Sequence, residues 1–303
     1  STSLTRAVAY NLVYSFAKTE LLSGVTTIRT VGGLGDFDTR LRDDINSGKK
    51  QGPRILAANT VISVPDGHMA GSVAVAAKNI DEALAQLEKS RKENVDLIKL
   101  MITGGVMDAK EKGVPGELKM SPEMVKAVCD KAHEYGYTVA AHVESPEGVR
   151  VALENGVDSI EHGAKPDEHI INLFKERGAF LCTTLSPALP YALFDRSLTN
   201  ATEVEQYNGN VVFKGIIECS KAAIENNIPV VLGNDVGCPW ITQYDFYREL
   251  YYFTKYVGVS NKFALYTATL NSARMAGIDN VTGSIEKGKS ADMIVTEKNP
   301  LDD

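Results

Sequence analysis

The stretch VDLIKLMITGG, residues 95–105, surrounds a single lysine with apolar side chains. The run stops at two glycines, which is the pattern of a short strand that is buried on both faces. Lysine is one of the residues least often fully buried, and an unpaired ammonium group in a protein core is very costly. The sequence therefore demands a partner or a special chemical role for Lys99.

The overall composition is that of a soluble globular protein. The chain has 303 residues, of which 44% are hydrophobic and 23% charged, and its length suits a single (β/α) barrel. The net charge of -7 argues against a nucleic-acid partner. No apolar run approaches the ~20 residues that a membrane span requires, and the first residues lack the order of a secretory signal.

The four cysteines are widely spaced and form no CxxC pair. This usage fits reduced thiols in a cytoplasmic protein, although the sequence by itself leaves a disulfide open. We therefore expect a cytoplasmic protein that binds a small-molecule substrate, with neither nucleic acid nor a membrane as its partner. The sequence also leaves open whether copies associate as a homo-oligomer.

Short apolar runs alternate with amphipathic helical patterns along most of the chain. The predicted strands are 25–31, 54–62, 95–102, 138–143, 159–162, 180–185 and 229–235. The clearest helical patterns between them are 80–92, 121–135, 145–155, 167–177 and 215–226. This alternation indicates an α/β protein with a parallel sheet, either closed as a TIM barrel or open and doubly wound.

A closed (β/α)8 barrel needs one strand more than the seven predicted here. Because the chain opens on a helical pattern at residues 3–23, we expect strand 1 to lie upstream of residue 1. Residues 283–295 read as two short strands turning near Gly288 and Lys289, which resembles the edge of a small β-sandwich subdomain. The predicted domains are therefore a barrel of strands 2–8 over residues 1–277 and a remnant of a β subdomain over 278–303.

Four polar residues occupy the ends of predicted strands, where the chemistry of a parallel barrel is found. They are Lys99, His142, His162 and Asp235. Two neutral imidazoles and a carboxylate form a common ligand set for zinc and similar cations. We therefore predict a divalent-metal site, while for each histidine alone a hydrogen-bonded core residue is the simpler alternative.

Lys99 has two interpretations within that site. A buried amine has a lowered pKa and can act as a neutral nucleophile. Reaction with carbon dioxide would convert it into a carbamate, whose anionic oxygens can bridge two cations. Alternatively, Lys99 forms an ion pair with an acid such as Glu161 inside the barrel, and the spacing of the residues does not separate these two readings.

Taken together, these segments resemble the amidohydrolase superfamily, in particular its imidazolonepropionase-related and Xaa-Pro dipeptidase-like metal-dependent hydrolases. The matching pieces run in family order over almost the whole chain. They are GVTTIR (24–29), IKLMITGG (98–105), AAHVE (140–144), SIEHG (159–163), LGND (232–235), TLNSA (269–273) and GSIEKGKSADMIV (283–295). Each segment alone is weak evidence for the resemblance, but the series of segments is specific to the superfamily, although not to a substrate.

The resemblance implies a role for each strand-end residue. Lys99 would be the carboxylated lysine that bridges the metals, and His142 and His162 would be ligands of one metal. The cofactor would be one or two divalent metal ions, which we expect to be zinc. Asp235 would be a ligand of the other metal and the catalytic proton shuttle. The superfamily also has an H-x-H pair on strand 1, which is missing among the five histidines of this sequence. That gap agrees with a strand 1 upstream of residue 1.

The reaction that the resemblance implies is hydrolysis of an amide-type C–N bond in a dipeptide, an N-acyl amino acid or a cyclic amide, through a metal-activated water. His68 and Tyr191 are the predicted substrate contacts, with solvent-facing loop residues as the alternative for both. Glu144, which would repel a substrate carboxylate, suits an NH-rich ring, or it caps the helix that follows.

Two other functions stay open at this point. The first is a mononuclear ring hydrolase or deaminase of the imidazolonepropionase type, in which Lys99 remains an amine and Glu144 shuttles protons. The second is a metal-free scaffold that keeps the barrel but has lost catalysis, which the missing H-x-H pair would favour.

Overall fold

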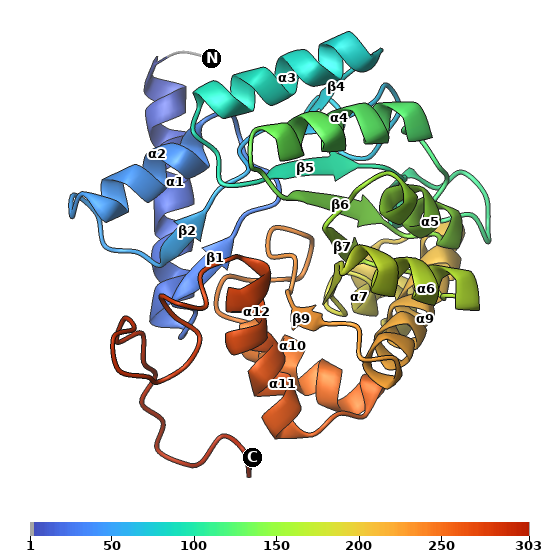
Figure 1. The fold of residues 1–303 in the computed structure, drawn as a ribbon. Helices are drawn as coiled ribbons and strands as arrows, with labels where there is room; N and C mark the ends of the chain where they lie inside the picture. The colour runs from blue at the N-terminus through green and yellow to red at the C-terminus, as the bar shows by residue number, and fades with distance from the viewer. Residues whose placement is uncertain (1–2, 303) are drawn as a thin grey trace.

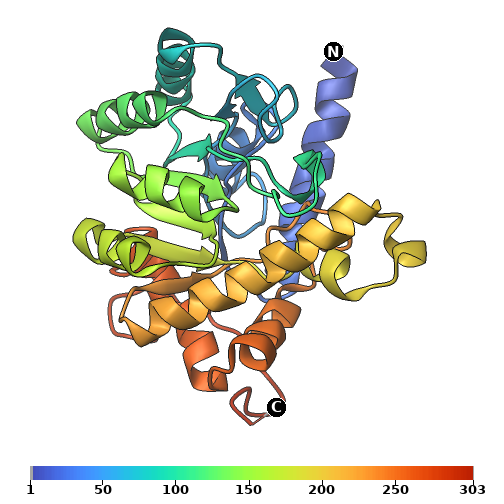
Figure 2. The ribbon, with the colours of Figure 1, turned by 90° about the vertical axis from the view of Figure 1, so that its right-hand side faces the viewer.

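The structure, a computed structural model, describes residues 3–302 and is an α/β fold with every strand pair parallel. Figures 1 and 2 show the strands at the centre of the molecule and helices along the outside. The strands are β1 (Thr27–Arg29), β2 (Arg54–Leu56), β3 (Val61–Ser63), β4 (Ala74–Ala76), β5 (Ile98–Met101), β6 (Val139–Val143), β7 (Ser159–His162), β8 (Phe180–Thr183) and β9 (Val230–Leu232).

The helices follow the strands in the order expected of β-α units. They are α1 (Ser3–Leu22), α2 (Phe37–Asn46), α3 (Ile80–Lys92), the 3-10 turn η1 (Val106–Asp108), α4 (Pro122–Glu134), α5 (Pro146–Glu154), α6 (Glu168–Arg177), α7 (Leu189–Leu193), α8 (Arg196–Thr199), α9 (Glu203–Glu225), α10 (Phe246–Tyr252), the π-helical turn η2 (Phe253–Val257), α11 (Asn261–Ala268) and α12 (Leu270–Met275). Within residues 3–302, no helix combines the length and the apolarity that crossing a membrane would take.

The predicted parallel wall is present and curved. Seven strands pair in the order β4-β3-β5-β6-β7-β8-β9, and β1 and β2 form a separate pair. The two sheets are joined by a backbone hydrogen bond from the Asp96 N–H to the Ala57 carbonyl (2.8 Å) just before β5. From β1, the side chain of Arg29 reaches Ser159 and Glu161 of β7. The wall therefore bends around a shared interior, as the barrel prediction requires.

The predicted strand 54–62 is wrong as a single element, because it is broken into β2 and β3. Asn59, between them, has a left-handed φ of 56° and is fully buried. Its side chain exchanges hydrogen bonds with Thr39 of α2 and donates to Glu93 after α3. These bonds turn the backbone out of the strand, and Asn tolerates that conformation better than most residues. Strand β4 was not predicted.

Helix boundaries follow the local chemistry of the sequence. Ser121 and Ser145 accept hydrogen bonds from the backbone N–H groups three residues ahead, each followed by a proline at the first helical position. Asp167 caps α6 in the same way, and Gly178 ends that helix in the left-handed region at φ 67°. The predicted helices 121–135, 145–155 and 167–177 are therefore confirmed.

The core lies between the curved wall and the outer helices. Every residue of β5, β6 and β7 is buried, which confirms the reading of the opening stretch as a strand covered on both faces. The largest side chains with almost no exposure include Leu100, Ile160 and Leu181 on strands and Ile170 and Phe174 on α6. Burial on this scale is what gives a domain its stability.

The predicted hairpin in residues 283–295 is wrong: in the described chain, β9 is the last strand, and the tail consists of turns and irregular backbone. Two strands alone are marginally stable in water, and Ile285 and Val295 here are 85% and 96% exposed. The tail is tied instead to β2, because Arg54 donates to Asp292 (2.7 Å) and to Ser290. Figure 1 shows it beside β1 and β2. The domain boundary at 277 stays a prediction.

The close packing of α7 against α9 leads to a prediction about Gly209. A Cβ atom there would lie 2.2 Å from the Cβ of Tyr191, whereas one at Gly215 of the same helix would lie 3.3 Å from its nearest neighbour. Overpacking typically costs ~1–3 kcal/mol, while replacing a mid-helix glycine by alanine gains up to ~1 kcal/mol. We expect Gly209→Ala to lower the free energy of unfolding in urea and Gly215→Ala to leave it nearly unchanged. Equal stability of the two variants would contradict this packing.

Candidate active site

The four polar residues predicted at the strand ends share one interior region. Lys99, His142 and His162 are nearly fully buried on β5, β6 and β7, and Asp235 is half-buried just after β9. The ring centroids of the two histidines are 4.8 Å apart. The charge of Asp235 acts on the pKa values of both Lys99 and His162.

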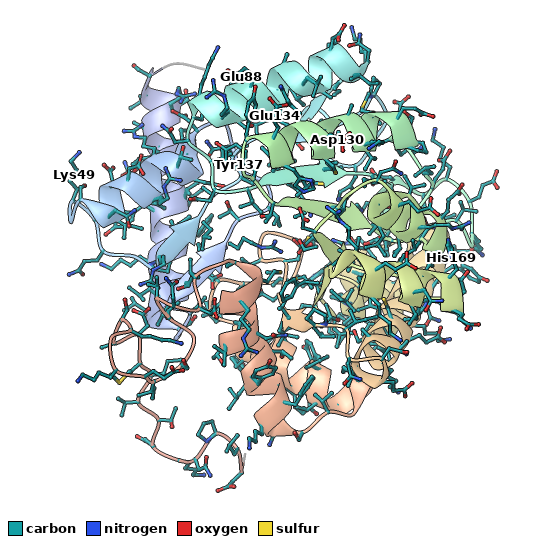
Figure 3. The ribbon with its side chains drawn as sticks, viewed as in Figure 1. Lys49, Glu88, Asp130, Glu134, Tyr137 and His169 are labelled. Atoms are coloured by element: carbon teal, nitrogen blue, oxygen red, sulfur yellow. The ribbon has the colours of Figure 1, made fainter. Side chains whose placement is uncertain are left out.

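The histidines divide into an outer and an inner set. His133 pairs with Asp158 (2.7 Å) and His169 with Glu154 (3.3 Å), and Figure 3 shows His169 on the outer face of α6. The remaining three histidines lie next to one another in the interior: the His68 ring is parallel to that of His142 with centroids 4.1 Å apart, and the rings of His142 and His162 meet edge to face. The inner set is His68, His142 and His162.

Hydrogen bonds fix which nitrogen of His142 is open to a ligand. Its Nε2 contacts the Gly104 carbonyl at 3.2 Å. A carbonyl only accepts, so Nε2 carries the proton and Nδ1 keeps its lone pair. In His162 the bond between Nδ1 and the Thr184 hydroxyl (2.6 Å) leaves Nε2 available. Each ring therefore offers one nitrogen, as in metal-binding histidines held by a second partner.

Burial keeps both rings neutral. Desolvation, reinforced by the charges of His68 and His162, lowers the pKa of His142 far below its ordinary value. Desolvation also lowers the pKa of His162 to about 4, in spite of the opposing charge of Asp235. At neutral pH both imidazoles are unprotonated, which is the form that binds metal ions.

Lys99 lacks the ion pair that the simpler reading assigned to it. The nearest candidate, Glu161, bonds instead to Arg29 (2.7 Å) and Ser159 (2.8 Å). Within residues 3–302, no ion pair or hydrogen bond to the Lys99 ammonium is present. Desolvation lowers the pKa of Lys99, although the carboxylates of Glu161 and Asp235 oppose the shift. The side chain is thus a buried amine with a weakened hold on its proton.

Sequence reasoning missed Arg29 as a part of this interior. Its guanidinium pairs with Glu161, and the two side chains are 14% and 5% exposed. Burial alone would raise the pKa of Glu161, but the charges of Arg29 and Lys99 lower it to about 2. The signal was present in the segment GVTTIR, because Arg29 lies inside the predicted strand 25–31 as Lys99 lies inside the predicted strand 95–102.

Glu144 lies closer to the histidines than the sequence indicated. One ligand atom from each of His142, Glu144 and His162 lies within 4.8 Å of the others. Burial and the charge of Asp235 raise the pKa of Glu144 to about 8, although the Val106 N–H donates to its Oε2 (3.1 Å). The suggested capping role is wrong, because Ser145 caps the following helix.

The predicted substrate residue Tyr191 is buried beside the loop that follows β9. Its ring meets that of Trp240 edge to face, with centroids 5.7 Å apart. In the same loop, Asp235 adopts a left-handed φ of 53°, and the Cys238 thiol donates to its Oδ2 (3.2 Å). The loop after β9 therefore carries both the Asp235 carboxylate and Trp240, the ring that packs against Tyr191.

These donors fit a divalent cation. Two neutral imidazole nitrogens, a carboxylate at position 235 and either Glu144 or a modified Lys99 supply the nitrogen and oxygen ligands that zinc prefers. Lys99 adds a buried amine to this set, and burial lowers its pKa although the carboxylates of Glu161 and Asp235 act against that shift. The metal and the carbamate themselves stay predictions.

Histidines on successive strands of a parallel α/β barrel lie in the region where such barrels carry their active sites. Residues 3–303 match the amidohydrolase family, and the chain belongs to that family, which confirms the predicted resemblance. A "putative prolidase" from Bifidobacterium longum is 40% identical with a TM-score of 0.90, covering 97% of this chain and 72% of that one.

Two further relatives extend the comparison. A Xaa-Pro dipeptidase structure with bound methionine is 30% identical with a TM-score of 0.87, and the match covers 98% of this chain and 75% of that one. Ochratoxinase from Aspergillus niger is 25% identical over 93% of this chain and 62% of its own length. The chain therefore spans less than two thirds of that curated relative.

The buried pair of Arg29 and Glu161 leads to a stability prediction. Arg29→Met leaves the carboxylate of Glu161 buried without its main partner, and such a loss typically costs ~3–5 kcal/mol. We expect this decrease in the free energy of unfolding, measured by denaturant titration. The double variant Arg29→Met/Glu161→Gln should recover part of it, because the amide carries no charge. Undiminished stability of Arg29→Met would show that the pair contributes nothing.

Glu249 of α10 holds the loop that leads from β8 towards Tyr191. Its carboxylate accepts hydrogen bonds from the backbone N–H groups of Leu185 (2.5 Å) and Ser186 (2.8 Å), and from the Ser186 hydroxyl. Glu249 is fully buried, and this desolvation raises its pKa to about 7 although the hydrogen bonds oppose the shift.

This raised pKa predicts a pH-dependent stability. Between the unfolded value of 4.5 and the folded value of about 7, the native state binds more protons than the unfolded state. The free energy of unfolding should therefore fall as the pH rises through this window, by on the order of 3 kcal/mol for this group. Glu249→Gln lacks the titrating group, so the difference between wild type and variant should change with pH. A constant difference between pH 4 and pH 8 would refute the assignment.

Proposed function

We propose that the whole protein hydrolyses amide-type C–N bonds in small substrates that carry a carboxylate, such as dipeptides or N-acyl amino acids. The observation that carries this proposal is the pair of buried histidines whose ring centroids lie 4.8 Å apart, with the charges of Lys99 and Asp235 acting on His162. Membership of the amidohydrolase family and the prolidase-like relatives support it. We also propose that the enzyme is cytoplasmic.

His142, His162, Asp235 and Lys99 would hold one or two divalent cations, for which zinc is our proposal. Lys99 would do so as a carbamate, formed when its neutral amine attacks carbon dioxide and releases a proton. The bound metal would lower the pKa of a water molecule and polarise the substrate carbonyl. An H-x-H pair on a strand upstream of residue 1 would complete this ligand set.

Asp235 performs the proton transfers in the proposed reaction. Its carboxylate accepts the proton of the attacking water and returns it to the leaving nitrogen as the tetrahedral intermediate collapses. The left-handed backbone at Asp235 and the hydrogen bond from Cys238 hold this carboxylate in one orientation. A fixed acid/base of this kind typically contributes ~10²–10⁴-fold to the rate.

His68 and Tyr191 are the proposed substrate contacts. The His68 ring lies on that of His142, so a group bound by the one is adjacent to the other. The Tyr191 ring is packed against Trp240, which fixes the direction of its hydroxyl. A phenol and an imidazole can together bind the carbonyl and the carboxylate of a short substrate.

One observation favours a second candidate, a mononuclear ring hydrolase or deaminase. Glu144 lies in the same cluster as His142 and His162, and its pKa is raised to about 8. A proton-bearing acid in this position suits a ring nitrogen better than a substrate carboxylate. Metal analysis discriminates the two: two metal ions per chain support the carbamate site, and one supports the ring hydrolase. Absence of any turnover in the metal-loaded native protein would leave the scaffold alternative.

The proposed role of Asp235 predicts the behaviour of Asp235→Asn. The amide cannot accept the proton of the attacking water, so kcat on a panel of dipeptides and N-acyl amino acids should fall by at least ~10²-fold. The matched control Asp66→Asn, at an exposed carboxylate with the same left-handed backbone, should leave kcat unchanged. A wild-type kcat in Asp235→Asn would remove this residue from the mechanism.

A further inference from the structure

Two loops that are distant in the sequence meet above His142. His68 lies between β3 and β4, and Asp108 ends η1 after β5. The His68 Nδ1 and the Asp108 Oδ2 are 2.6 Å apart, which is a short, charge-assisted hydrogen bond. The same Oδ2 also accepts the backbone N–H of Gly105 at 2.8 Å. One carboxylate oxygen therefore ties the His68 loop to the loop after β5.

The remaining contacts of His68 hold it from two other sides. Its backbone carbonyl accepts a hydrogen bond from the Ser63 hydroxyl at 2.9 Å. Its ring lies nearly parallel to that of His142, with an interplanar angle of 6°. The side chain is 16% exposed and that of Asp108 is 29% exposed, so both are largely shielded from water. Asp108 is the contact that sets the rotation of the ring.

The hydrogen bond also selects one tautomer of His68. An ionised carboxylate only accepts, so Nδ1 must carry the proton. Nε2 is then the one ring nitrogen left to contact a substrate. A histidine whose other nitrogen is held in this way keeps both its tautomer and its orientation.

We propose that Asp108 is a positioning residue for substrate binding, because its carboxylate fixes the ring and the tautomer of His68 above His142. The proposal rests on the proposed function, in which His68 contacts the substrate. The competing role for Asp108 is purely structural, as the residue that closes η1 through the Gly105 N–H. Both roles use one oxygen atom, so the experiments must separate them.

The first experiment is a double-mutant cycle in the metal-loaded native protein, with kcat/KM as the readout. We expect Asp108→Ala to lower kcat/KM roughly 10- to 100-fold, as removal of a histidine's orienting partner typically does. Asp108→Ala/His68→Ala should be no worse than His68→Ala, because Asp108 acts through His68. Multiplicative losses would overturn the proposal in favour of the structural role. Lys110→Ala, an exposed change in the same loop, is the matched control.

The second experiment does not depend on turnover. In the metal-free protein labelled with ¹⁵N-histidine, NMR should report the Nδ1–H tautomer of His68 in the wild type. We expect Asp108→Ala to lose this preference and Asp108→Asn to keep it, because the amide oxygen can accept from the same donors. An unchanged His68 tautomer in Asp108→Ala would refute the proposal, even if the protein proved inactive on every amide tested. Inactivity of the wild type would refute the proposed function alone.

Discussion

The interior of this barrel depends on the buried ion pair between Arg29 and Glu161. It joins β1 to β7 across the space enclosed by the wall and is shielded from water on both sides. Glu161 bonds directly to Arg29, while Lys99 makes no direct ion pair among the described residues, and desolvation lowers the pKa of Lys99 although the charges of Glu161 and Asp235 oppose the shift. A buried pair of this type contributes little net stability but makes loss of either partner costly. In this interior, Arg29 is the cation that makes the direct ion pair with Glu161.

Desolvation also lowers the pKa values of His142 and His162. Buried imidazoles at the ends of β6 and β7 lose their protons at neutral pH, and each is held by a hydrogen bond to one of its nitrogens. The nitrogen atoms of this candidate metal site are thereby held in place, which would lower the cost of binding a cation there. Residues in the loops hold two more side chains of this region in place: Cys238 contacts Asp235, and Asp108 contacts His68. The family membership agrees with this arrangement, while the substrate depends on contacts that lie in these loops.

The errors of the sequence analysis have local physical causes. The strand predicted at 54–62 is interrupted at Asn59, whose side chain bonds to Thr39 of α2 and to Glu93 just after α3, contacts that no periodicity reveals. The tail 283–295 has the alternation of strands, but it lacks neighbouring strands to cover its apolar face, and a bond from Arg54 holds it instead. Glu144 was interpreted through its neighbours in the chain, whereas its surroundings are His142 and His162 on two adjacent strands.

The sequence by itself determined the α/β class, the parallel pairing of the strands and the placement of Lys99, His142 and His162 in buried strands, because burial and strand periodicity are local properties that leave a readable pattern. The family followed from short segments in a fixed order. Only the tertiary structure decided the partners: that Glu161 bonds to Arg29 and not to Lys99, that His68 stacks on His142, and that Asp108 reaches His68. Such pairings join residues that are tens of positions apart, and they depend on how the wall curves, which no single segment encodes.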